Sequence, residues 1–186
     1  MPPKVKTTKE DITKAALQIV RRNGAENLNA RVLADELSRS TQPIFSNFAT
    51  MDELRLKVVE KADIMCQEYI KNECESGIYP TYKATGMAYI RFAKEEKQLF
   101  KLLYMRDRTN EEINEVTKFN LQIEKIVKDN TGLETDNVKL FHLEMWAYVH
   151  GIATMFATGY LNLDWELVSK MLTDSYNGLR KQYGLE

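Results

Sequence analysis

The sequence of 186 residues is poor in the residue types that build turn-rich and disulfide-bonded folds. It contains 8 Gly and 4 Pro, too few for a collagen-like, linker-rich or turn-dense all-β protein. Its 2 Cys, Cys66 and Cys74, cannot form a disulfide framework or a zinc site built from four thiolates. We therefore expect two reduced thiols in a cytoplasmic protein, and neither a metal nor a cofactor.

Long apolar segments are also scarce. The first six residues carry positive charge, but no apolar segment follows them, which argues against a signal peptide. The longest uncharged stretch, residues 145–163, includes His150 and several Tyr, Thr and Asn side chains. That is too much polarity for a span in contact with lipid. We expect a helix buried between protein neighbours, and no membrane partner.

Sequence patterns of catalytic sites are missing as well. There is no Gly-rich phosphate loop, no nucleophile elbow and no pair of carboxylates at a catalytic spacing. The two histidines, His142 and His150, lack the flanking carboxylates of a metal site. The sequence therefore predicts a protein that is not an enzyme.

Helical periodicity, in contrast, extends over almost the whole chain. Apolar residues recur at intervals of three and four, and no stretch alternates with a period of two over the length of a strand. We therefore predict an all-α fold. The predicted helices cover residues 7–23, 29–37, 40–48, 50–75, 81–96, 98–105, 109–130, 135–158 and 164–183.

Polar residues mark several of the predicted helix ends. Residues 7–10 and residues 50–53 have the pattern of a capping box, in which a Thr side chain and a Glu side chain satisfy free amides of the first turn. Asn29 is a favourable N-cap, and Gly24 provides a left-handed stop. The charged run at residues 94–97 is typical of a solvated helix face.

Charge is distributed unevenly along the chain. The net charge of -1 excludes a uniformly basic nucleic-acid-binding protein. Residues 1–48 nevertheless carry eight Lys and Arg against five Asp and Glu, a net charge of +3, which leaves -4 for residues 49–186. We predict a three-helix head at residues 1–48 that contacts a polyanion, and a larger helical body at residues 49–186.

The spacing within the head predicts a helix-turn-helix. The second and third predicted helices are short, and two residues connect them tightly. In this motif the first helix crosses the DNA backbone, and the second enters the major groove by its N-terminal end. That end reads Ser40-Thr41-Gln42-Pro43. Gln can pair with adenine, Ser and Thr can reach bases or phosphates, and Pro within a first turn stiffens the helix.

The head resembles the DNA-binding domain of the TetR family of transcriptional regulators. The resemblance lies in residues 28–48 and 51–54, which match the family's frame without gaps. Heads of this family typically have Arg early in the second helix, Tyr-x-His-Phe at the end of the recognition helix and Lys-Glu-Glu-Leu at the start of the fourth. This sequence has Phe45 for Tyr, Asn47 for His, Met51 for Lys and Ser38 for a common Gly. Phe45 and Met51 thereby remove two polar contacts to phosphate.

The resemblance implies a role for each exposed residue of the motif. Ser40, Thr41 and Gln42 lie at the tip of the recognition helix, where Thr41 and Gln42 are expected to face base edges. Phe45, one turn further on, can contact a thymine methyl group, or it can pack within the head. Phosphate contacts, which add affinity without sequence information, are expected from Arg31, Ser46 and Asn47.

The body resembles one subgroup of TetR-type C-terminal domains. Residues 146–151 match a Trp-x3-His-Gly signature, and residues 82–93 and 99–105 are also similar. The resemblance implies a small-molecule effector, flat or lipophilic in character, in a pocket with aromatic walls. The residues expected to border it are Phe92, Phe100, Tyr104, Trp146 and His150. The alternative is that these side chains fill a solid core, with His150 as a core histidine.

The last two predicted helices have the composition of a dimer interface. Ala147, Gly151 and Thr154 are small enough to allow the close approach of a partner helix, and residues 165–179 add an apolar stripe. Two heads about one turn of DNA apart would read a palindromic operator in double-stranded DNA. By the resemblance, the effector moves the helix at residues 50–75, changes the spacing of the heads and releases the operator.

Three classes of function are open at this point. The first is a cytoplasmic, homodimeric repressor that leaves its operator when it binds a small molecule. The second is a DNA-binding regulator without a small-molecule ligand, whose body only dimerises or contacts another protein. The third is a helical carrier or enzyme, which would require a catalytic cluster that the sequence does not show.

Overall fold

The computed structural model describes residues 7–106 and 114–185, with the backbone alone for residues 114–122. Within these ranges every regular element is helical, which confirms the predicted all-α fold. The elements are α1 (Lys9–Asn23), the 3-10 turn η1 (Ala25–Asn27), α2 (Ala30–Glu36), α3 (Gln42–Asn47), α4 (Met51–Ser76), α5 (Thr81–Glu95), α6 (Lys97–Tyr104), α7 (Asn114–Thr131), α8 (Thr135–Thr158) and α9 (Trp165–Gln182). None of these helices combines the length and the apolar character needed to cross a membrane.

The described residues form two compact units. The first unit consists of the described residues of 1–67 and 96–106, and the second of those of 68–95 and 107–186. The chain passes from one unit to the other inside α4, after Gln67, again between α5 and α6, after Glu95, and a third time after Arg106. The first unit therefore contains α1 to α3, the first part of α4 and α6. The predicted division between a head at residues 1–48 and a body at residues 49–186 stays a prediction.

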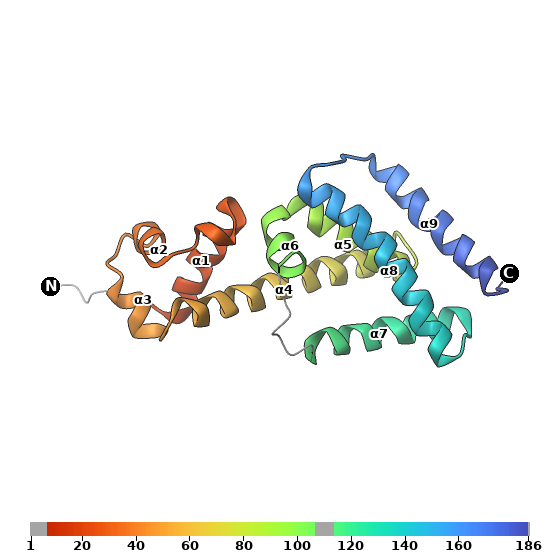
Figure 1. The fold of residues 1–186 in the computed structure, drawn as a ribbon, viewed down its shortest axis with the longest axis horizontal. Coiled ribbons are helices and arrows are strands. Elements are labelled where there is room, and N and C mark those ends of the chain that lie inside the picture. The colour runs from red at the N-terminus through yellow and green to blue at the C-terminus, as the bar shows by residue number, and fades with distance from the viewer. Residues whose placement is uncertain (1–6, 107–113, 186) are drawn as a thin grey trace. The chain divides into compact units, whose positions relative to one another are not determined.

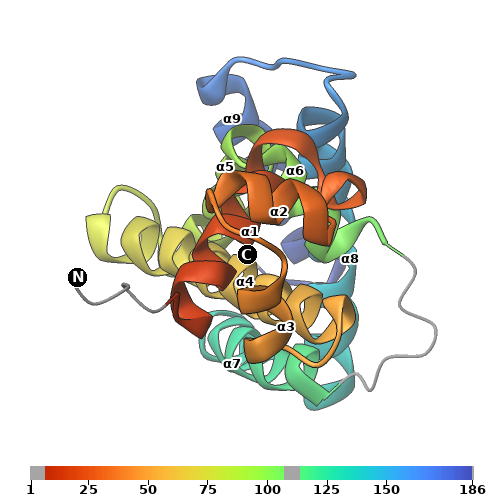
Figure 2. The ribbon, with the colours of Figure 1, turned by 90° about the vertical axis from the view of Figure 1, so that its left-hand side faces the viewer.

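The core of the first unit is formed by the apolar faces of its short helices. Figures 1 and 2 show α1, α2 and α3 grouped around one end of α4. Ile12, Leu33, Ile44, Phe48 and Leu54 are all buried completely or almost completely, and they come from α1, α2, α3, the following connection and α4. Burying each of these side chains contributes about 1.5–3 kcal/mol to folding. This shared core fixes α3 relative to α1 and α4.

The second unit is built around α5 and α8. Phe141 and Met145 of α8 form a buried cluster with Ile123 and Val127 of α7. On α5, Gly86 lies where α8 and α9 approach closely, since a Cβ atom at this position would be 3.1 Å from Leu172 Cδ2. The absence of a side chain at Gly86 thus allows α5 to pack tightly between its neighbours.

Several helix ends agree with the sequence predictions, and others differ. α8 begins and ends at the predicted residues, and α2 follows its predicted N-cap Asn29, whose side chain accepts from the amides of Arg31 and Val32. The first capping box is displaced by one residue: Thr8 and Asp11 form it, in place of residues 7–10. α3 begins at Gln42, two residues later than predicted. The predicted start of the helix at residue 109 lies outside the described residues.

Candidate functional site

The helices α2 and α3 are joined by a tight turn, as a helix-turn-helix requires. The turn contains Ser38, whose φ of 49° lies in the left-handed region that glycine adopts most readily. The amide of Ser38 donates to the carbonyl of Asp35 and that of Arg39 to the carbonyl of Ala34, both at 3.0 Å. These bonds end α2 and redirect the chain toward α3 within a few residues.

The side chains at the N-terminal tip of α3 are exposed to solvent. Ser40, Thr41 and Gln42 are all exposed, and Pro43 lies in the first turn as predicted. Thr41 is the N-cap residue, but its hydroxyl makes no capping hydrogen bond. Phe45 is 50% exposed, whereas the adjacent Ile44 is fully buried. The helix therefore directs its aliphatic side chain into the core and presents polar groups and one aromatic ring to solvent.

The two residues at the end of α3 use their donors within the protein. Ser46 Oγ donates to the carbonyl of Gln42 at 2.9 Å, and Asn47 Nδ2 donates to the carbonyl of Pro43 at 2.8 Å. Asn47 Nδ2 also lies 3.4 Å from the carbonyl of Thr7, just before α1. Ser46 and Asn47 thus stabilise the short helix and its position, and these donors would have to reorient to contact phosphate.

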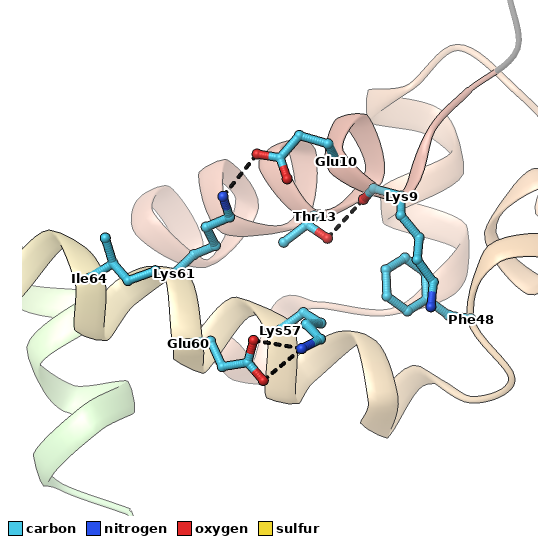
Figure 3. Close-up of a pocket in the computed structure, with 8 residues that line it drawn as sticks. All are labelled: Lys9, Glu10, Thr13, Phe48, Lys57, Glu60, Lys61 and Ile64. Atoms are coloured by element: carbon cyan, nitrogen blue, oxygen red, sulfur yellow. Dashed lines mark hydrogen bonds and ion pairs between the residues drawn. The ribbon is translucent and has the colours of Figure 1, made fainter. Parts of the chain in front are cut away.

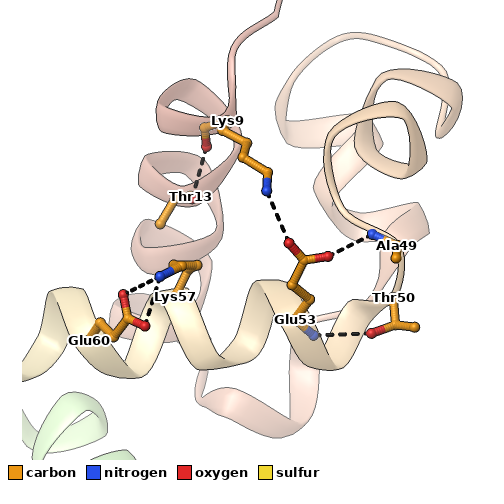
Figure 4. Close-up of polar contacts among 7 residues, drawn as sticks. All are labelled: Lys9, Thr13, Ala49, Thr50, Glu53, Lys57 and Glu60. Carbon is orange, nitrogen blue, oxygen red and sulfur yellow. Dashed lines mark hydrogen bonds and ion pairs between the residues drawn. The ribbon is translucent and has the colours of Figure 1, made fainter.

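A hydrogen-bond network around Glu53 joins α1, the end of α3 and the start of α4 (Figure 4). Glu53 accepts from the Ala49 amide at 2.7 Å and from Lys9 Nζ at 3.0 Å, and its own amide donates to Thr50 Oγ1 at 3.1 Å. The hydrogen bond from the Ala49 amide and that from Lys9 hold the pKa of Glu53 below its ordinary value. Lys9 Nζ also lies over the ring of Phe48, 4.9 Å from its centroid. The network extends the predicted capping box by a contact to α1.

A pocket of about 140 Å³ lies between α1 and α4 in the same unit (Figure 3). Lys9, Lys57 and Lys61 line it, and each of the three ammonium groups is paired with a carboxylate: Lys9 with Glu53, Lys57 with Glu60 and Lys61 with Glu10. The lysines of this pocket are therefore neutralised by their neighbours. The Lys9–Glu53 and Lys61–Glu10 pairs join α1 to α4, whereas the Lys57–Glu60 pair lies within α4.

Two arginines near α3 form no ion pair with any carboxylate in the described part of the chain. Among the described residues no carboxylate pairs with Arg31, at the start of α2, or with Arg39, in the turn before α3. Both are exposed. Arg31 is a predicted phosphate contact, whereas the sequence analysis assigned no role to Arg39. Only the structure shows that Arg39 is exposed and has no ion pair among the described residues, because the sequence does not reveal which basic residues have partners.

The aromatic residues predicted to border an effector pocket are divided between the two units. Phe100 and Tyr104 belong to α6 in the first unit, with ring centroids 5.0 Å apart. Phe100 is fully buried, and Tyr104 Oη lies 3.4 Å from the buried thiol of Cys66. Burial raises the pKa of Cys66 to about 12, so this thiol is protonated and unreactive.

The other predicted pocket residues, Phe92, Trp146 and His150, belong to the second unit. Phe92 is fully buried, with its ring edge-to-face against Tyr69. Trp146 is 43% exposed, and its indole stacks on His150 with centroids 4.9 Å apart. Tyr89 Oη lies 2.9 Å from His150 Nδ1, and burial lowers the pKa of His150. The structure thus brings Trp146 and His150 together with Tyr89, which the sequence analysis did not select.

A second tyrosine–histidine pair joins the same two helices. Tyr82 of α5 and His142 of α8 form a hydrogen bond of 3.1 Å between Oη and Nδ1. Burial raises the pKa of Tyr82 and lowers the pKa of His142. The tyrosine therefore keeps its proton, and its hydroxyl group can donate a hydrogen bond to the neutral imidazole. In residues 7–106 and 114–185 no group of three or more His, Cys, Asp or Glu is placed to hold a metal ion.

One face of α8 is exposed and largely apolar. Leu143 is 58% exposed, and Leu140, Ala147 and Thr158 are also exposed at helical spacing. Gly151 lies on this face, and a Cβ atom added there would meet nothing within 4 Å. Gly178, in the interior of α9, has the same open surroundings. An interior glycine weakens a helix by about 1 kcal/mol, and no packing within this chain offsets that cost at either position in the described residues. Both positions therefore suit the close approach of another chain.

A comparison with protein families gives a match for one long segment of the chain. Residues 82–174 match the model of the tetracyclin repressor-like C-terminal domain. No curated protein sequence matches the chain.

Comparison with solved structures covers the whole chain. A TetR-like transcriptional regulator from Rhodococcus sp. RHA1 superposes with a TM-score of 0.70 at 13% identity, covering 99% of both chains. A member of the TetR family from Streptomyces coelicolor A3 superposes with a TM-score of 0.57 at 15% identity, covering 90% of this chain and 96% of the other. At these identities the superpositions establish the fold.

Proposed function

Because the chain belongs to the TetR family of transcriptional regulators, we propose that it is a homodimeric repressor that reads a palindromic operator in double-stranded DNA. Family membership also confirms that the protein is a regulator and not an enzyme. The observation that carries the proposal is the helix-turn-helix of α2 and α3, with an exposed polar tip held on a rigid core.

Base reading is assigned to the tip of α3. Gln42 is exposed, and its amide can donate to and accept from an adenine edge in the major groove. Ser40 and Thr41 flank it with hydroxyl groups, and Phe45 offers half of its ring to a thymine methyl group. The Glu53 network supports this reading, because it holds the C-terminal end of α3 between α1 and α4.

Phosphate contacts are assigned to the side chains of Arg31, Ser46 and Asn47. Arg31 has no carboxylate partner among the described residues, so a phosphate can bind it without breaking an ion pair. Ser46 and Asn47 join this set when their side chains turn from the helix carbonyls toward DNA. These contacts add affinity and register, and the bases contacted by the tip add sequence preference.

Dimerisation is assigned to α8 and α9. The exposed stripe of α8 and the two unfilled glycines provide a surface that a second copy of α8 and α9 would cover in a four-helix bundle. A lone chain would leave this apolar stripe in water. The dimer places two heads on one operator, which matches a palindromic site.

Release by a small molecule is assigned to the aromatic residues predicted from the sequence, each considered within its own unit. Phe92, Phe100, Tyr104, Trp146 and His150 combine aromatic surface with few polar groups, which suits a lipophilic or aromatic effector. The effector binds the form that does not fit the operator, so DNA in turn weakens effector binding. We place this regulator in the cytoplasm, where the Cys66 and Cys74 thiols remain reduced.

Two substitutions test the assignment of DNA contacts. Gln42→Ala should cost roughly 1–3 kcal/mol on the preferred duplex and relax the preference at one base position, because it removes a base contact. Arg31→Ala should weaken binding to all duplexes alike and reduce the salt slope by about one, because it removes a phosphate contact. Affinities are measured by fluorescence anisotropy at several salt concentrations. An equal loss of affinity for preferred and random duplexes in Gln42→Ala would refute base reading by Gln42.

A further inference from the structure

The first unit contains an ion pair between α1 and the start of α6, in which the carboxylate is buried and the Arg21 side chain is 43% exposed. Glu96 is only 3% exposed, although the sequence analysis predicted a solvated face at residues 94–97, and for Glu96 that prediction is wrong. Arg21, in the last turn of α1, binds it with two donors: Nε donates to Oε2 at 2.6 Å, and Nη2 donates to Oε1. Residues 75 positions apart in the chain are thus joined in a bidentate contact.

The burial of Glu96 distinguishes this pair from an ion pair between two exposed side chains. A buried carboxylate that loses its cation remains desolvated without compensation, which strongly destabilises the arrangement that buries it. The exposed pair of Arg22 and Glu36 lies one residue further along α1 and serves as a contrast, because water screens and solvates both partners. α6 therefore cannot leave α1 without rehydrating or orphaning Glu96.

Glu96 lies at the point where the chain passes from the second unit back to the first. α5 ends at Glu95 in the second unit, and the first unit resumes at Glu96. The backbone at Glu96 leaves the helical conformation, with φ of -114° and ψ of 50°. The first residue to enter the first unit from α5 is therefore the residue whose side chain α1 holds.

We propose that the Arg21–Glu96 pair makes α6 a part of the DNA-binding head and acts as the positioning contact that fixes α1 relative to α6 within the first unit. This inference rests on the proposed function, since it needs a head that binds DNA. Loss of the pair frees α6 from this contact and changes the position of α1 within the head. Arg21 and Glu96 are positioning residues and touch no base or phosphate.

The test uses the full chain with Glu96→Gln, which removes the charge and keeps the shape. The matched control is Glu36→Gln, which breaks the exposed pair between Arg22 of α1 and Glu36 of α2. Hydrogen exchange measures the protection of amides in residues 97–104, and fluorescence anisotropy measures affinity for the duplex that the wild-type protein selects from a random-sequence pool. Both are measured below the unfolding temperature of each variant. Arg21→Lys, which keeps the charge but loses the fork, gives a second comparison if Glu96→Gln does not fold.

We expect Glu96→Gln to speed exchange in residues 97–104 by at least roughly tenfold. Affinity for the selected duplex should fall by roughly 2- to 30-fold with an unchanged salt slope, because the head is displaced while every phosphate contact remains. Arg21→Lys should show a smaller loss of both, and Glu36→Gln none. Unchanged exchange in residues 97–104, or faster exchange with wild-type DNA affinity, overturns the inference. A wild-type chain that selects no duplex overturns the proposed function instead.

Discussion

Ser38 shows how a single residue can carry strain at the centre of the candidate site. Its φ of 49° places a residue with a Cβ atom in the left-handed region, in the turn that sets the angle between α2 and α3. This conformation costs an L-residue about 1–2 kcal/mol, whereas glycine adopts it freely. The turn is nevertheless retained, because the amides of Ser38 and Arg39 are both bonded to α2.

Replacing this residue by glycine should therefore stabilise the protein. We expect Ser38→Gly to raise the free energy of unfolding by about 0.5–1 kcal/mol, the relief of strain less the greater chain entropy of glycine. Urea unfolding monitored by circular dichroism measures the change. Ser38→Ala is the control, because it removes the hydroxyl and keeps the strain. A Ser38→Gly variant no more stable than Ser38→Ala would show that the turn is not strained.

His142 makes stability depend on pH. Burial lowers its pKa below the ordinary value of 6.5, while the charge of Glu124 acts in the opposite direction with a smaller effect. The unfolded chain thus binds a proton more readily than the folded one as the pH falls through 6.5. Stability should be lost in that direction, because a protonated imidazole cannot accept the hydrogen bond of Tyr82.

The contribution of His142 is measured by comparing urea unfolding at about pH 7.5 and about pH 5.5. The wild-type protein should lose more stability across this interval than His142→Gln, which keeps an acceptor near Tyr82 but does not titrate. The variant should retain some dependence, because burial also lowers the pKa of His150. Equal pH dependence in the two proteins would mean that His142 has the same proton affinity in the folded and unfolded chains.

Among the helices, α8 has the clearest division between a buried and an open face. Gly151 interrupts its interior, and a Cβ atom there would meet no other described part of the chain within 4 Å beyond its own stretch of helix backbone. Gly151→Leu should leave each chain folded, since there is room and leucine favours helix, but it should block the close approach of a partner helix. We expect light scattering at micromolar concentration to show a dimer for the wild type and a monomer for the variant.

A matched control separates steric blockage from the general effect of an added leucine. Thr135→Leu adds the same side chain at an exposed position of α8, roughly 160° around the helix from Gly151. It should remain a dimer. A dimeric Gly151→Leu variant, with wild-type circular dichroism, would place the interface on another face of the molecule.

The ends of helices could be predicted from the sequence where a single residue strongly favours a helix start or stop. α8 ends at Thr158 because Gly159 takes the left-handed conformation, and the apolar periodicity fixes its extent. At the start of α1 two adjacent threonines are each followed three residues later by an acidic residue, so sequence alone allows two registers. The structure selects Thr8, whose hydroxyl accepts from the Asp11 amide at 3.1 Å.

Contacts between distant segments could not be predicted in the same way. Local pattern assigned Glu96 to a charged surface run, because nothing nearby in the sequence identifies Arg21 as its partner. Likewise, the Tyr89 hydroxyl beside His150 follows from the packing of α5 on α8. The tip of α3 was easier to predict, since its exposure follows from the burial of Ile44 and Phe48 at helical spacing.

At the scale of the whole molecule, the division into two units does not follow the order of the chain. The first unit joins α1–α3 to α6, so a segment that follows α5 in sequence packs with the proposed DNA-binding motif. The chain passes between the two units three times, inside α4, before α6 and after Arg106.

The central claim is that the chain reads duplex DNA by sequence through α3. The most direct measurement titrates the wild-type protein against the duplex it selects from a random-sequence pool and against a scrambled version, over a range of salt concentrations. We predict tighter binding to the selected duplex at every salt concentration, with log K falling linearly with log salt for both. Equal affinity for the two duplexes, or no affinity for either, would contradict the claim.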